Sequence, residues 1–86
     1  MDFEWDSKKN ALNLEAHGLD FKDAANFDWD GAQFLQDGRK DYNETRTVGV
    51  GYYGDRLTVI IFTNRNSKTR LISWRKANQR EVKKYG

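Results

Sequence analysis

The sequence predicts an α+β protein with two N-terminal helices, an antiparallel β-sheet meander and a C-terminal helix. Three observations support this fold class. Residues 1–30 contain helix-capping residues that precede helix-compatible segments. Residues 46–74 hold three apolar, strand-like runs separated by turn residues, and residues 75–85 are polar and compatible with a helix. A chain of 86 residues is expected to form one small domain, residues 1–86.

The N-terminal part is expected to hold a short strand at residues 3–5 and two helices. Asp6 can cap a helix over residues 7–17, because its carboxylate can accept hydrogen bonds from the first turn, and Gly18 can end that helix. Asp20 can cap a second, shorter helix in the same way. The segments before the meander are a possible strand over residues 32–36 and an expected loop over residues 37–43.

The strands of the meander are expected at residues 46–53, 56–63 and 69–74. The middle strand carries apolar residues on both faces, which predicts a central strand covered on both sides. Strict alternation places Arg70, Ile72 and Trp74 on one face of the last strand. In the C-terminal helix few residues can pack, so it is expected to rest on the sheet; they are Ala77, Val82 and Tyr85.

Charge is divided unevenly along the chain. Residues 1–45 hold 11 acidic and 5 basic residues, whereas residues 46–86 hold 10 basic and 2 acidic residues. Clustered Arg and Lys can neutralise phosphates and release counterions, so the basic half could bind nucleic acid, or it could dock an acidic protein.

The composition excludes several chemistries. The absence of Cys rules out disulfides, a thiol nucleophile and a thiolate zinc site, and a single His rules out a His-pair metal site. No metal or cofactor is expected. The sequence has no signal-peptide pattern and no apolar run that could span a bilayer, so a cytoplasmic protein without membrane contacts is expected.

Three polar residues, Lys9, Asn13 and His17, share one face of the first predicted helix, because they are spaced four residues apart. They could contribute a general acid or base (His17) and a cation (Lys9) to a phosphate site. Alternatively, this face is only solvated, and His17 stabilises the C-terminal end of the helix.

A second group of candidate residues surrounds the last strand. Arg70, Arg75 and Arg80 could bind an anion together with nearby basic residues, or could be solvated; the neighbours are Arg65, Lys68 and Lys76. Trp74 could stack a base, although core packing is the preferred interpretation. Glu44 and Arg46 could form a surface ion pair or orient a catalytic arginine.

Several of these segments together resemble the BrnT toxin family. The opening match comprises Phe3-Glu4-Trp5-Asp6, Lys9, Asn13, His17-Gly18, Phe21 and Ala24, and Asp41 to Arg46 resembles a Glu-x-Arg segment. The closing match comprises Phe62 to Arg65, Arg70 to Ala77 and Glu81 to Tyr85. The sequence departs from the family pattern in three places: Trp74 replaces a small residue, Asn43 replaces a common Gly, and Glu15-Ala16 stands where a basic residue is usual before His-Gly.

The resemblance implies a RelE-like fold and a bacterial type II toxin that cleaves RNA without a metal. It also implies a BrnA-type ribbon-helix-helix antitoxin, through which alone the toxin would meet DNA. The resemblance carries over Lys9, His17, Arg46, Arg65, Arg70, Ser73 and Arg75.

The leading hypothesis is an endoribonuclease with catalytic His17, Arg65, Arg70 and Arg75. Its substrate-binding residues would be Lys9, Arg46, Ser73, Lys76 and Arg80. The alternatives are a nucleic-acid-binding module without catalysis and a protein-interaction domain.

Overall fold

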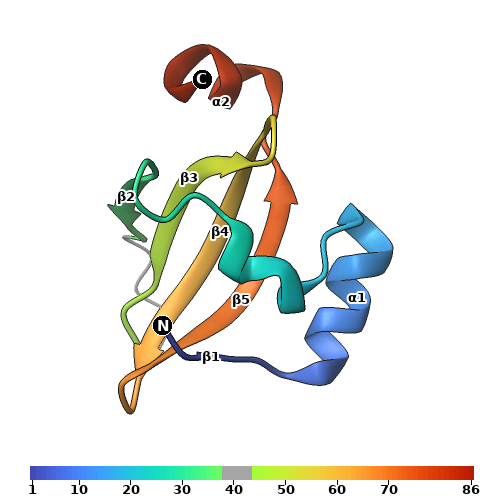
Figure 1. Ribbon diagram of the computed structural model, residues 1–86, viewed down its shortest axis with the longest axis vertical. Coiled ribbons are helices and arrows are strands. Elements are labelled where there is room, and N and C mark those ends of the chain that lie inside the picture. Colours follow the sequence, from blue (N-terminus) through green and yellow to red (C-terminus); the bar gives the residue numbers. More distant parts are fainter. Residues whose placement is uncertain (38–43) are drawn as a thin grey trace.

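The computed structural model describes residues 1–37 and 44–86 (Figure 1). Most of the predicted loop, including Asn43, lies outside these residues. Five strands form one sheet in the order β1-β5-β4-β3-β2, with β1 parallel to β5 and every other neighbouring pair antiparallel. The strands are β1 (Phe3–Glu4), β2 (Gln33–Gln36), β3 (Thr47–Tyr53), β4 (Arg56–Arg65) and β5 (Lys68–Lys76).

Helix α1 (Ser7–His17) follows β1, and helix α2 (Gln79–Tyr85) ends the chain. Helix α1 has the predicted caps, since the Asp6 side chain accepts from the backbone N–H groups of Lys8 and Lys9 and Gly18 adopts φ 71°. Between α1 and β2 lies the short 3₁₀-helix η1 (Phe21–Asn26). Within the described residues, no helix is long and apolar enough to cross a membrane.

The predicted fold class was wrong in its architecture. Instead of two N-terminal α-helices ahead of an antiparallel meander, the described residues have one α-helix near each end and a mixed five-stranded sheet. The second predicted helix is η1, where a period of three residues places Phe21, Ala24 and Phe27 on the same side, all buried. The sheet gains β1 as a parallel edge strand, and a strand of two residues carries almost no local pattern that could predict such pairing.

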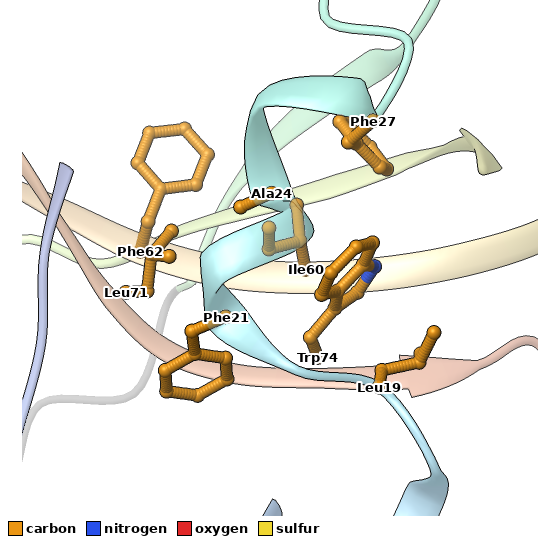
Figure 2. Close-up of a cluster of buried hydrophobic side chains, with 8 residues drawn as sticks. All are labelled: Leu19, Phe21, Ala24, Phe27, Ile60, Phe62, Leu71 and Trp74. Atoms are coloured by element: carbon orange, nitrogen blue, oxygen red, sulfur yellow. The ribbon is translucent and has the colours of Figure 1, made fainter. Parts of the chain in front are cut away.

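One face of the sheet, here called the aromatic face, carries the main core. It is formed by Ile60 and Phe62 of β4 and Leu71 and Trp74 of β5, and it is covered by Phe21 and Ala24 of η1 and by Phe27, which follows η1 (Figure 2). Helix η1 crosses the sheet in front of β4 and β5 in Figure 1. A smaller apolar cluster on the opposite face seats the start of α2 and Tyr85; it comprises Val50, Leu57, Val59 and Ala77.

Helix α1 runs beside β5 and is joined to it mainly through one polar side chain (Figure 1). The buried Asn13 amide donates to the carbonyl oxygens of Leu19 (3.0 Å) and Trp74 (2.8 Å), and its oxygen accepts from the Trp74 N–H (3.0 Å). These bonds satisfy backbone groups of Trp74 on the side of β5 that faces away from β4. Asn13 therefore replaces a neighbouring strand at the point where β1 has ended.

A β-bulge in β5 decides which side chains share a face. Ser73 lies opposite Ile61 but Leu71 lies opposite Phe62, so Ile72 is the extra residue of the bulge. The predicted alternation of Arg70, Ile72 and Trp74 onto one face was therefore wrong. Trp74 and Leu71 lie on the aromatic face, and Arg70 lies on the opposite face.

Candidate functional site

The face of the sheet opposite the aromatic core gathers most of the cationic side chains of β4 and β5. In the antiparallel register Val59, Ile61, Thr63 and Arg65 alternate onto this face, and directly opposed residues point to the same side. Their partners place four polar side chains there, Arg75, Ser73, Arg70 and Lys68 respectively. We call this surface the arginine face and define it by Arg65, Lys68, Arg70, Ser73 and Arg75. At about 3.3 Å per residue it extends for roughly 20 Å along β5, from Lys68 to Arg75.

Each of its arginines forms an ion pair with a glutamate from a different part of the chain. Arg65 Nη2 lies 2.6 Å from Glu44 Oε2, and Arg70 Nη1 lies 2.7 Å from Glu4 Oε2 of β1. Arg75 binds Glu81 of α2 through two parallel bonds of 2.8 and 2.9 Å. The glutamates fix the arginines in place, and they also neutralise part of the positive charge.

These ion pairs remain open to solvent. The side chains of Glu4 and Glu44 are each 27% exposed and that of Glu81 is 22% exposed. Solvent-accessible pairs contribute only about 0–1 kcal/mol to stability, so an anionic ligand can compete with the carboxylates or add to them.

Glu44 lies between two guanidinium groups. Besides Arg65, it has Arg46 Nε at 3.9 Å from its Oε1 atom. The hydrogen bond from Asp37 N to Arg46 O extends the β2–β3 ladder, and alternation from Val48 places Arg46 on the arginine face. Of the two interpretations drawn from the sequence, the ion pair between Glu44 and Arg46 is present, and Glu44 also holds Arg65.

Among the described residues of the site, the pKa of Glu81 is shifted most. Hydrogen bonds from Arg75, aided by the backbone N–H of Asn78, lower the pKa of Glu81 to about 2. The same bonds to Glu81 raise the pKa of Arg75. Both partners therefore stay charged at neutral pH.

Lys9 and His17 lie on α1, one turn to either side of the buried Asn13, and both are exposed. Because residues four apart share a helix face, both lie on the side of α1 that faces β5. Backbone N–H groups of Lys8 and Lys9 lower the pKa of Asp6, with smaller contributions from the charges of Lys9 and Arg70. Asn13 itself is structural.

Three residues singled out in the sequence lie away from the arginine face. Lys76 lies opposite Thr58 and so projects to the aromatic side, and Arg80 is exposed in the first turn of α2. Trp74 is fully buried; its ring contacts Phe27 and Tyr53, and its Nε1 donates to Thr58 Oγ1 at 3.0 Å. The tryptophan that replaces a small residue of the family pattern is therefore core and does not reach the arginines.

Sequence reasoning missed two of the glutamates. Glu4 is 66 positions from Arg70, and only the parallel pairing of β1 with β5 brings them together, so no local pattern identified it. Glu81 had a local signal, because Asn78 and Glu81 have the spacing of a capping box. That signal fixes where α2 begins and thus places Glu81 near the end of β5.

Two pockets lie outside the arginine face. A groove of about 660 Å³ separates α2 from the β3–β4 hairpin, and a smaller pocket of about 320 Å³ lies beside Trp29, Phe34 and Phe62. None of the predicted site residues lines either of them. In the described part of the chain, no group of three or more His, Cys, Asp or Glu side chains is arranged to hold a metal ion.

Fold and site together define a small α+β protein in which one sheet face is sealed by aromatic residues and the other displays paired arginines. Comparison with protein-family models matches residues 5–81 to the family described as "Ribonuclease toxin, BrnT, of type II toxin-antitoxin system". The chain belongs to this family, and the resemblance noted in the sequence is confirmed. No curated protein sequence matches the chain. Membership implies an RNA target and an antitoxin partner.

Proposed function

We propose that the protein is a metal-independent endoribonuclease that cleaves RNA at the arginine face. The observation that carries this proposal is the convergence of Arg65, Arg70 and Arg75 on one open face of the sheet. Fixed guanidinium groups can stabilise the charge that develops on phosphoryl oxygens in a transition state. Preorganisation by the three glutamates suits this role, because it reduces the reorganisation needed during the reaction.

The chemistry needs only the RNA itself as nucleophile. A ribose 2′-oxygen attacks the adjacent phosphorus while the bond from phosphorus to the 5′-oxygen breaks, which yields a 2′,3′-cyclic phosphate and a 5′-hydroxyl. His17 takes the proton from the 2′-hydroxyl while water protonates the leaving 5′-oxygen, or it donates a proton to that oxygen while water takes the one from the 2′-hydroxyl. One histidine does not readily serve both ends of the scissile bond, so the arginines supply much of the rate through electrostatics.

The remaining predicted residues would bind the substrate. Arg46 and Ser73 lie on the arginine face and would contact phosphates next to the scissile bond, and Lys9, exposed on α1, would contact the RNA backbone from that helix. Lys76 and Arg80 lie away from that face and would meet only more distant parts of the RNA.

The proposal is tested with purified, antitoxin-free protein and end-labelled single-stranded RNA in excess EDTA. The wild type is expected to cleave, with 2′,3′-cyclic phosphate ends, and Arg70→Ala is expected to lose at least tenfold in kcat/KM. Arg56→Ala is the matched control, because Arg56 is exposed at the start of β4 opposite Tyr53, away from the arginine face. Intact RNA after prolonged incubation with folded wild type contradicts the proposal. Salt-sensitive binding without cleavage would instead identify a binding module, and no affinity even at low salt would identify a protein-interaction domain.

The antitoxin is proposed to be a ribbon-helix-helix protein of the BrnA type, encoded beside this chain, that mediates any contact with DNA. Support comes from family membership, since a type II toxin requires a protein antitoxin. Induced expression of the wild type should arrest growth, and co-expression of the neighbouring reading frame should restore it. Arrest by Arg70→Ala as strong as that by wild type would contradict the assigned site.

A further inference from the structure

We propose that Glu81 is a positioning residue for RNA cleavage: it aims Arg75 at the substrate phosphate through the N-terminal cap of α2. This inference rests on the proposed function. Glu81 does not itself touch RNA in this proposal; it acts only through the guanidinium of Arg75.

The ion pair between Glu81 and Arg75 leaves one edge of the guanidinium group open. Glu81 Oε1 and Oε2 accept from Arg75 Nη1 at 2.8 Å and Nη2 at 2.9 Å, and Nη1 also donates to the carbonyl of Lys76 at 3.3 Å. A guanidinium has five N–H donors, and these contacts account for three of them. Among the described residues, the N–H of Nε and the second N–H of Nη2 are left. These two groups share one edge of the guanidinium and form the second fork with which arginine binds two oxygens of a phosphate.

Glu81 is itself held by the N-terminal cap of α2. Its Oε1 also accepts from the backbone N–H of Asn78 at 2.9 Å, while the Asn78 side chain accepts from the backbone N–H of Glu81 at 2.8 Å. This capping box fixes the carboxylate at the start of α2, and Ala77 and Tyr85 pack on the sheet at either end of that segment. The carboxylate is therefore positioned by the same contacts that seat α2 on the sheet.

The ion pair orders the Arg75 side chain before the substrate binds. Arg75 lies on the arginine face opposite Val59, with its side chain partly exposed. An unpaired arginine samples many rotamers, and ordering it when substrate binds costs free energy. A guanidinium already fixed in the free protein avoids that cost, which matters most in the transition state. The other two arginines have one glutamate bond each, so Arg75 is the most tightly oriented of the three.

The test is a double-mutant cycle on RNA cleavage. Glu81→Gln keeps an oxygen for the cap but presents an amide N–H to Arg75, so the paired fork is lost. We expect kcat/KM to fall about tenfold in the wild-type background and to be unchanged when the same substitution is made in Arg75→Ala. Asn78→Ala is the matched control, because it removes the side-chain half of the cap, the bond from the Glu81 N–H, but leaves the backbone N–H of residue 78 and Arg75 as donors to the Glu81 carboxylate. It should lower the midpoint of thermal unfolding without a comparable loss of cleavage.

Two further readouts separate the outcomes. The Nη–H NMR signals of Arg75 that donate to Glu81 should be resolved and slowly exchanging in the wild type and should broaden or merge with those of the other arginines in Glu81→Gln. Should Glu81→Gln fail to fold, Arg75→Lys replaces it, because lysine keeps the charge without the fork and should show a similar loss. Three results would overturn the inference: equal losses of cleavage from Glu81→Gln with and without Arg75, unchanged cleavage by Glu81→Gln, or full activity of Arg75→Lys. In each of these cases, cleavage by the wild type would still uphold the proposed function. Absence of cleavage by the wild type overturns both.

Discussion

The two faces of the sheet differ in what holds their side chains. On the aromatic face, Trp74 and Ile60 are fully buried and pack against η1 through apolar contacts. On the arginine face, Arg70 and Arg75 are held by partly exposed ion pairs. Burial of large apolar side chains contributes several kcal/mol each, whereas exposed ion pairs contribute little. The main core and the proposed chemistry therefore lie on opposite sides of the same strands, although a smaller apolar cluster underlies α2 on the arginine side.

The largest effect is expected for Trp74→Ala on the aromatic face. The substitution removes a fully buried ring, its contacts with Phe27 and Tyr53, and its hydrogen bond to Thr58, so it should cost about 3–5 kcal/mol. Urea unfolding followed by tryptophan fluorescence or circular dichroism measures this loss. Trp74→Phe, which keeps an aromatic ring, should lose distinctly less. A loss below about 1 kcal/mol for Trp74→Ala would mean that the ring is not core.

A smaller loss is expected for Asn13→Ala at the edge of the sheet. Without the amide, the Trp74 N–H, the Trp74 carbonyl and the Leu19 carbonyl lose their partners, which should cost about 2–3 kcal/mol. Leu12→Ala, at an exposed position on the same helix, is the control and should change stability little. Amide hydrogen exchange should show faster exchange at Trp74 in Asn13→Ala. Unchanged protection there would contradict the role of Asn13 as a substitute strand.

On the arginine face, substitutions should affect RNA cleavage more than stability. Glu4→Gln removes the charged partner of Arg70 and should cost at most about 1 kcal/mol in the free energy of unfolding. Its effect on RNA cleavage should exceed its effect on stability, because Arg70 loses its orientation. Denaturant unfolding and single-turnover cleavage measured on the same sample make the comparison. A stability loss near that of Trp74→Ala, with cleavage intact, would erase the distinction between the two faces.

Local signals predicted part of this fold and long-range pairing decided the rest. Helix α1 was predicted to the residue because Asp6 and Gly18 act within a few positions of it, and β3, β4 and β5 were located to within about two residues by their apolar patterns. The parallel pairing of β1 depends on contacts across most of the chain, which no local pattern encodes. The 3₁₀ form of η1 depends on packing its three-residue repeat against the sheet.

The candidate site shows the same division more sharply. Arginines around β5 were predicted, but simple alternation would have put Arg70 and Arg75 on opposite faces. The extra residue Ile72 shifts the alternation of side chains by one position, so that Arg70 and Arg75 lie on the same face. Two of the carboxylate partners, Glu4 and Glu81, come from the two ends of the chain. The arginines can be read from the sequence, but the bulge and the two ion pairs that arrange them on one face cannot.

The smallest effect expected is a pH dependence confined to Glu81. Its pKa is about 2 in the folded protein, against 4.5 for an ordinary glutamate, so the unfolded chain binds its proton more readily. The stabilisation from Glu81 is therefore fully present above about pH 4.5 and is lost as the pH falls toward 2. The measurement is the difference in free energy of unfolding between wild type and Glu81→Gln across this range. Because Asp6 and Asp20 titrate in both proteins, the difference isolates Glu81. It should shrink as the pH falls; a difference that stays constant from pH 7 to pH 2.5 would mean that the ionised carboxylate does not stabilise the arginine face.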